Sequence, residues 1–127
     1  MIVSIGIDII EIRRVREVLA RTPRFRVRVF TEGERAYCDS RGDAAAQHYA
    51  ARFAAKEAAF KALQTGWRDG IYWHDIEVAS NGAGAPLLRI HRRALELFDA
   101  LGATDAHLSL SHTREHAVAQ VIFERQP

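Results

Sequence analysis

The stretch "ARFAAKEAAFKAL", residues 51–63, has the composition of a helix, because alanine and leucine favour that conformation. Phe53 and Phe60 are seven residues apart, so they mark one apolar stripe along it. Lys56 and Glu57 follow Phe53 by three and four residues, which places a charge pair in the same stripe. Since a charge among buried carbon needs a partner or a metal, this helix is predicted to contribute both to a core and to a site.

A strand and two helices are predicted before this stretch. Residues 2–10 alternate apolar and polar positions, so Asp8 is expected to face away from the row of valine and isoleucine side chains. A helix is expected over residues 11–20, and Pro23 interrupts the pattern after it. Thr31 stands three residues before Glu34, a capping-box spacing that predicts a second helix from about residue 31.

The central helix is predicted over residues 45–63, after a loop "DSRGDAAA". The segment "QTGWRDGI" ends it with Gly66 and Gly70. Two short strands, "WHDIEVAS" and "PLLRIH", flank the turn "NGAGAP", a helix "RALELFDALGA" follows, and residues 106–124 resemble a hairpin. We therefore expect a single α+β domain over residues 1–127, with a largely antiparallel sheet packed against one long central helix and shorter helices.

The composition is that of a soluble globular protein, with 48% apolar and 27% charged residues in a chain of 127. Cys38 is the only cysteine, so no internal disulfide forms and a cytoplasmic location is expected. The apolar start "MIVSIGIDII" is too short to span a membrane and lacks the basic lead-in of a signal peptide.

The basic residues are unevenly distributed along the chain. Seven arginines between Arg13 and Arg28, against Glu17 alone, give that segment a net charge of +6 and leave −4 for the rest of a chain whose net charge is +2. Such a segment favours an anionic partner, which includes nucleic acid, an acidic protein and a phosphorylated ligand. A solvated surface without a partner is the alternative interpretation.

Asp8, Glu57 and Lys61 are the candidate catalytic group. Carboxylates from two elements beside a lysine suit Mg²⁺, which takes few protein carboxylates together with phosphate oxygens and water. Lysine adds a mobile point charge for phosphate. Two plainer interpretations stay open: Glu57 and Lys61 as an i, i+4 surface ion pair, and Asp8 as a helix-start residue.

Other chemistries are poorly supported by the sequence. The histidines at 107, 112 and 116 have neither a cysteine partner nor an HExxH pattern, which argues against zinc. Ser109 and Ser111 lack a nucleophile-elbow context, and no phosphate-binding glycine loop is present.

Three segments carry a family resemblance: "GIDIIEIRRV" (6–15), "RFAAKEAAFKAL" (52–63) with a following "TG", and "HLSLSHTREHAVAQVI" (107–122). In this order and spacing they resemble holo-acyl-carrier-protein synthase, the small bacterial type of 4′-phosphopantetheinyl transferase, over nearly the whole chain. The resemblance implies that fold. It also implies transfer of phosphopantetheine from coenzyme A to a serine of acyl carrier protein, within fatty acid biosynthesis.

The resemblance also implies roles for individual residues. Asp8 and Glu57 would hold Mg²⁺, and Lys61 would stabilise charge on the leaving phosphate. Glu57, directly or through a water, is the candidate base. Arg14, Arg21, Arg24 and Phe25 would dock the carrier protein. The coenzyme A pocket would be lined by Arg52, Lys56, Lys61, Pro86, Ser109, Ser111 and His112.

The family resemblance further implies a homotrimer in which adjacent subunits share each active site, with no role in binding nucleic acid or membranes. Two other interpretations of the sequence remain. One is a basic module that binds nucleic acid through residues 13–28, although it lacks the signatures of known RNA-binding modules. The other is an inactive carrier-protein scaffold, which the joint presence of Asp8, Glu57 and Lys61 disfavours.

Overall fold

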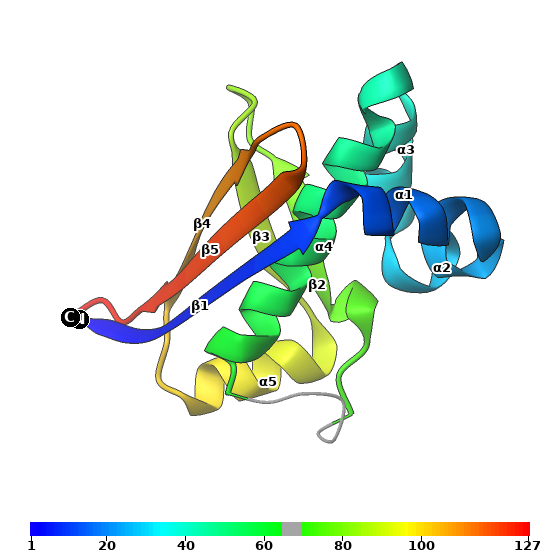
Figure 1. Ribbon diagram of the computed structural model, residues 1–127. Helices are drawn as coiled ribbons and strands as arrows, with labels where there is room; N and C mark the ends of the chain where they lie inside the picture. The colour runs from blue at the N-terminus through cyan, green and yellow to red at the C-terminus, as the bar shows by residue number, and fades with distance from the viewer. Residues whose placement is uncertain (65–69) are drawn as a thin grey trace.

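The structure is a computed structural model that describes residues 1–64 and 70–127 (Figure 1). The helices are α1 (Ile12–Arg21), α2 (Pro23–Val29), α3 (Glu32–Asp39), α4 (Ala45–Ala62) and α5 (Arg92–Ala100), with short 3₁₀ turns η1 (Gly42–Ala44) and η3 (Trp73–Asp75). The strands are β1 (Ile2–Glu11), β2 (Ile76–Ser80), β3 (Pro86–Ile90), β4 (Asp105–His112) and β5 (His116–Glu124).

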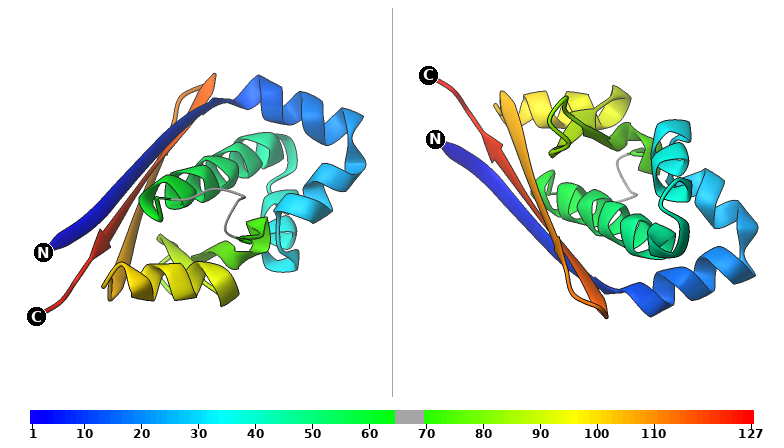
Figure 2. Two further views of the ribbon diagram at one scale, coloured as in Figure 1. Left: turned by 90° about the horizontal axis from the view of Figure 1, so that it is seen from below. Right: turned by 90° about the horizontal axis from the view of Figure 1, so that it is seen from above.

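The strands form two antiparallel sheets, which confirms the α+β expectation. One sheet has the order β1-β5-β4, and the other is the β2-β3 hairpin. Helix α4 lies between the larger sheet on one side and the β2-β3 hairpin with α5 on the other (Figure 2). The two chain ends meet, because the Met1 amino group donates to the Arg125 carbonyl oxygen at 3.0 Å.

Helix α4 is buried on nearly every side because most of its core positions are alanine. Ala54, Ala55, Ala58 and Ala59 are fully buried, and these small side chains let both sheets approach the helix. Phe53 and Phe60 pack on Trp73, with ring centroids 5.1 Å apart in each pair. The phenylalanine stripe therefore packs as the sequence indicated.

The inward face of β1 is the small and polar one. Ser4 Oγ donates to the carbonyl oxygen of Ala62 at 2.5 Å, and an added Cβ at Gly6 would lie 1.8 Å from the Ala58 carbonyl oxygen. Asp8 has the same orientation as Gly6, so it faces α4. The opposite face of β1 is exposed and apolar, with Ile5, Ile7 and Ile9 at 53%, 56% and 63% exposure.

The Asp8 side chain lies on the face of β1 that is opposite to the isoleucine row, as expected, but Asp8 does not cap a helix. Helix α1 starts at Ile12 and has Glu11 as its N-cap. Thr31 does cap α3: its Oγ1 accepts from the Glu34 amide at 3.2 Å, and Glu34 Oε1 accepts from the Thr31 amide at 2.8 Å. The predicted capping box is thus confirmed.

Three local expectations differ from the structure. Pro23 begins α2 rather than only breaking a helix, since proline suits the first helical position. The loop expected from Asp39 contains η1, and the segment 73–75 expected as strand is the turn η3. Gly66, expected to end α4, lies outside the described residues, whereas Gly70 has a positive φ of 78°.

No helix in the described part of the chain is long and apolar enough to cross a membrane.

Candidate active site

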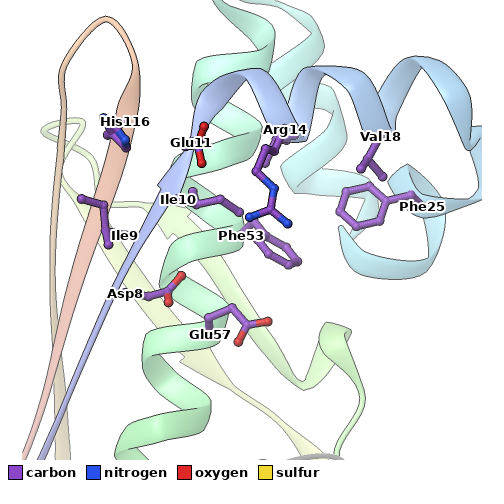
Figure 3. Close-up of a pocket in the computed structure, with 11 residues that line it drawn as sticks. Asp8, Ile9, Ile10, Glu11, Arg14, Val18, Phe25, Phe53, Glu57 and His116 are labelled. Carbon is purple, nitrogen blue, oxygen red and sulfur yellow. The ribbon is translucent and has the colours of Figure 1, made fainter.

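A cavity of about 530 Å³ opens where β1, α1, α2 and α4 meet (Figure 3). Asp8 enters it from β1 and Glu57 from α4, so the two carboxylates come from elements far apart in the sequence. The other lining residues are Ile9, Ile10, Glu11, Arg14, Val15, Val18, Phe25, Phe53 and His116. The cavity therefore combines an acidic floor with a mostly apolar wall.

Lys61 joins the helix to the strand beside this cavity. Its Nζ donates to Asp8 Oδ1 at 3.1 Å and to the Ile7 carbonyl oxygen at 2.9 Å. The Lys61 side chain is 55% exposed and that of Asp8 is 18% exposed. Lys61 therefore pairs with Asp8 on another element, so it is more than the i, i+4 surface partner of Glu57.

The Glu57 carboxyl has a pKa raised above its ordinary value. Partial burial is the largest cause, the negative charge of Asp8 raises the pKa further, and Lys61 opposes both. The negative charge of Asp8 makes the Glu57 carboxyl costlier to ionise, and a cation between the two carboxylates would lower that cost. This electrostatic arrangement fits Mg²⁺, which the family resemblance implies.

The number of protein ligands also fits that ion. Within residues 1–64 and 70–127, no group of three or more histidine, cysteine, aspartate or glutamate side chains is placed to hold a metal. Mg²⁺ is commonly held by one or two carboxylates, with substrate phosphate and water completing its octahedron. Asp8 and Glu57 are the residues that would hold it here.

Arg14 lies in the same cavity as the two carboxylates. Figure 3 shows its side chain pointing from α1 toward Phe53, on the side of the cavity where Glu57 lies. Phe25 packs on Phe53 with ring centroids 5.7 Å apart, so α2 contributes an apolar wall next to this arginine. Sequence spacing alone gave no indication that Arg14 lines the same cavity as the carboxylates, because the direction in which α1 leaves β1 decides it.

The arginines of the basic segment are not equivalent. Arg21 and Arg24 are exposed, as expected for residues that meet a partner. Arg26 is engaged internally: its Nε donates to Tyr49 Oη at 2.8 Å, and its guanidinium pairs with Asp39. These contacts lower the pKa of the Asp39 carboxyl, chiefly through the hydrogen bond from Arg26. Arg26 therefore fastens α2 to α3 and α4.

A second cavity, of about 170 Å³, brings together four of the residues expected around coenzyme A. Arg52, Pro86, Ser111 and His112 all line it. Arg52 is only 4% exposed, and its Nε is buried without a hydrogen-bond partner among the described residues. A buried guanidinium with an unused donor suits an anionic ligand.

His48 and Tyr37 belong to this second cavity although sequence reasoning missed them. The Arg52 guanidinium lies 4.1 Å from the Tyr37 ring centroid, and the Tyr37 and His48 ring centroids are 5.4 Å apart. Burial lowers the pKa of the His48 imidazole, and the charge of Arg52 adds to that effect. The i, i+4 spacing of His48 and Arg52 on α4 was the available signal.

Two expected site residues lie elsewhere. Lys56 has a fully buried ammonium, 2.9 Å from Glu34 Oε1, and it lines neither cavity. Ser109 lies on the exposed face of β4, in register with Gln120 of β5, and also lines neither cavity. The structure therefore does not bring these two residues to the Asp8–Glu57 cavity or to the Arg52 cavity.

The sequence is similar to that of many known proteins. A family model described as the 4′-phosphopantetheinyl transferase superfamily matches residues 4–121. The holo-[acyl-carrier-protein] synthase of Trichlorobacter lovleyi is 51% identical over 125 residues, which is 98% of this chain and 98% of the relative. That of Koribacter versatilis is 46% identical over 98% of this chain and 99% of the relative.

Solved structures share the same fold. The Bacillus anthracis holo-(acyl-carrier-protein) synthase, in complex with CoA (3′,5′-ADP), superposes with a TM-score of 0.81 at 39% identity and covers 99% of both chains. The Helicobacter pylori holo-[acyl-carrier-protein] synthase, in complex with coenzyme A, has a TM-score of 0.80 at 30% identity, over 94% of this chain and 99% of that one. The chain belongs to the 4′-phosphopantetheinyl transferase superfamily and, within it, to the holo-acyl-carrier-protein synthases.

Proposed function

We propose that this chain, as one catalytic domain, transfers 4′-phosphopantetheine from coenzyme A to a serine of apo acyl carrier protein and releases adenosine 3′,5′-bisphosphate. The reaction depends on Mg²⁺ and serves fatty acid biosynthesis in the cytoplasm. The observation that carries the proposal is the meeting of Asp8 and Glu57 at one cavity, with Lys61 paired to Asp8 beside it. Two carboxylates can hold a Mg²⁺ ion that binds the diphosphate, and a mobile lysine adds a positive charge for its cleavage.

The bonds that change follow from the two substrates. The serine Oγ attacks the β-phosphorus of coenzyme A, and the bond between that phosphorus and the oxygen of the α-phosphate breaks. Mg²⁺, when bound, supplies a Lewis acid for the phosphate oxygens. The Lys61 ammonium, beside Asp8, stabilises the negative charge that develops on the leaving oxygen.

The proton of the serine hydroxyl also needs an acceptor. Glu57 is the candidate, either directly or through a water. The apolar wall around Phe25 and Phe53 excludes water from one side of the cavity, which strengthens the electrostatic contacts within it.

We further propose that the enzyme is a homotrimer whose sites are shared between subunits. The exposed isoleucines of β1 form an apolar face on the larger sheet, and such faces usually mark an interface. The Asp8–Glu57 cavity and the Arg52 cavity have no residue in common. In the shared arrangement, the Arg52 cavity of one subunit takes the nucleotide end of a coenzyme whose diphosphate lies at Glu57 of the next.

Complementation tests the shared site. Glu57→Gln and Arg52→Ala should each be inactive alone, and mixing them under conditions of subunit exchange should restore part of the activity. Sedimentation should show a trimer for wild type and a smaller species for Ile5→Asp. An active monomer, or no recovery in mixed trimers, would contradict the shared arrangement.

The transfer itself is tested by mass. Incubation with apo carrier protein, coenzyme A and Mg²⁺ should increase the carrier's mass by one phosphopantetheine group at its serine. A carrier whose serine is replaced by alanine is the control. No adduct with any apo acyl carrier protein offered, from folded enzyme, would refute the proposed function.

A further inference from the structure

Lys56 and Glu34 form an ion pair that is completely buried. The Lys56 Nζ lies 2.9 Å from Glu34 Oε1, and both side chains are 0% exposed. Burial lowers the pKa of the lysine and the charge of Glu34 opposes that shift. The pair lies away from the Asp8–Glu57 cavity, although Lys56 directly precedes Glu57 in the chain.

Further hydrogen bonds tie this pair to the surrounding elements. Lys56 also donates to the carbonyl oxygens of Trp73, at 3.1 Å, and Ile76. Glu34 accepts from the amide of Val78 at 2.8 Å while it caps α3. The ammonium is therefore held from three directions, by α3, by η3 and by the first residue of β2.

The pair is not explained by stability alone. A buried ion pair costs so much desolvation that a well-packed apolar pair of similar size is often equally stable. The hydrogen bonds of the pair are directional, so they favour one rotation of α4 about its axis. The small alanines of α4 contribute little to fixing that rotation, so the pair acts together with the packing of Phe53 and Phe60 on Trp73.

The rotation of α4 matters most at the residue after Lys56. Successive helical residues are about 100° apart around the axis, so locking Lys56 toward α3 and β2 turns Glu57 toward β1. That orientation is the one in which Glu57 shares a cavity with Asp8. A rotation of α4 by a few tens of degrees would move the Glu57 carboxylate by several ångströms, since it lies far from the axis.

We propose that the Lys56–Glu34 pair is a positioning device that fixes the rotation of α4 and thereby holds the Glu57 carboxylate opposite Asp8. This inference rests on the proposed function, because it concerns the same two metal-holding carboxylates. Lys56 lines neither the Asp8–Glu57 cavity nor the Arg52 cavity, so in this role it acts through Glu57.

The test compares Lys56→Met with Phe98→Leu, a core variant on α5 chosen as a control for general destabilisation. Both are first shown to be folded by circular dichroism and thermal unfolding. Calorimetry then measures the binding of Mg²⁺ or Mn²⁺ in the presence of coenzyme A, and the binding of coenzyme A without metal. Metal affinity should fall at least about tenfold in Lys56→Met. It should stay within about twofold of wild type in Phe98→Leu, and metal-free coenzyme affinity should be unchanged in both.

Glu34→Gln provides a second variant in case Lys56→Met does not fold. It keeps an acceptor for the Val78 amide but removes the negative partner of Lys56, and the same loss of metal affinity is expected. Metal affinity equal to that of the control would overturn the positioning role, and loss of metal-free coenzyme binding would place Lys56 at the coenzyme instead. Wild type that binds no metal even with coenzyme A would overturn the proposed function itself.

Discussion

Lys61 and Asp8 join the two elements that build the candidate site: the lysine Nζ donates to Asp8 Oδ1 at 3.1 Å across the junction of α4 and β1. The same ammonium donates to the Ile7 carbonyl oxygen. One lysine thus neutralises part of the acidic floor while its own side chain remains 55% exposed to an incoming ligand.

Lys61→Ala should slow turnover more than it weakens coenzyme A binding. The charge of Lys61 matters most when the leaving oxygen becomes negative, so kcat should fall at least about tenfold with a smaller change in coenzyme KM. Steady-state kinetics at saturating carrier protein measures both. A loss confined to coenzyme affinity would show that Lys61 only binds the ground state.

Charge reversal at Arg21 and Arg24 should impair carrier-protein recognition. Both are exposed, whereas Arg14 lines the carboxylate cavity and Arg26 is held by Tyr49 and Asp39, so the first two give the cleaner test. The double variant Arg21→Glu, Arg24→Glu should raise the carrier KM at least about tenfold, or roughly 1.4 kcal/mol.

The control for this experiment is Arg93→Glu, an exposed arginine on α5. Coenzyme A affinity should stay nearly unchanged in both variants, and wild-type activity should decline with salt as exposed charges are screened. Unchanged kinetics in the double variant would mark Arg21 and Arg24 as solvated surface. Salt-sensitive RNA binding by wild type, with no loss on Asp8→Asn, would favour the nucleic-acid alternative.

Gly6→Ala should destabilise the protein and disturb the site together. The new methyl group would lie 1.8 Å from the Ala58 carbonyl oxygen, so β1 must move away from α4. Such overpacking typically costs about 1–3 kcal/mol. Denaturant unfolding should report that loss, and activity should fall because Asp8 shifts from Glu57. Gly82→Ala, with nothing within 4 Å of its added Cβ, is the control. Wild-type stability and activity in Gly6→Ala would show that this close approach is not required.

Cys38 should be unreactive in the folded enzyme. Burial raises the pKa of its thiol to about 12, so the reactive thiolate is nearly absent around pH 8, and the side chain is 0% exposed. Thiol labelling should be slow in buffer and fast in denaturant, and its rate in buffer should report opening of α3 from the core. Rapid labelling of native protein would contradict this packing.

The long helix α4 and the strand β1 were predictable because their signals are local. Alanine favours the helical conformation, so the composition of α4 predicts a helix. The alternation of apolar and polar residues in β1 predicts a strand. Which face of β1 turns inward was not predictable from hydropathy, because the isoleucines are the exposed side. The inward face is decided by the space that Gly6 leaves for α4, a contact between residues far apart in the chain.

The candidate site was predictable in part through three recognisable segments. Those segments indicated Asp8, Glu57 and Lys61, which the structure brings together. They did not show that Lys56 and Glu57 have different roles. Two adjacent charged residues in a sequence give no information about which side of a buried helix each one faces. Glu34, the partner that holds Lys56, lies 22 residues away and is visible only in the fold.

Binding of coenzyme A reports most directly whether Asp8 and Glu57 hold Mg²⁺ for its diphosphate. Calorimetry should compare coenzyme A binding with and without Mg²⁺ in wild type, Asp8→Asn, Glu57→Gln and, as control, the exposed α5 variant Asp99→Asn. Mg²⁺ should strengthen binding by wild type and Asp99→Asn and have little effect on the two site variants, which should also transfer no phosphopantetheine while remaining folded. An equal effect of Mg²⁺ in all four proteins would contradict a metal site at Asp8 and Glu57.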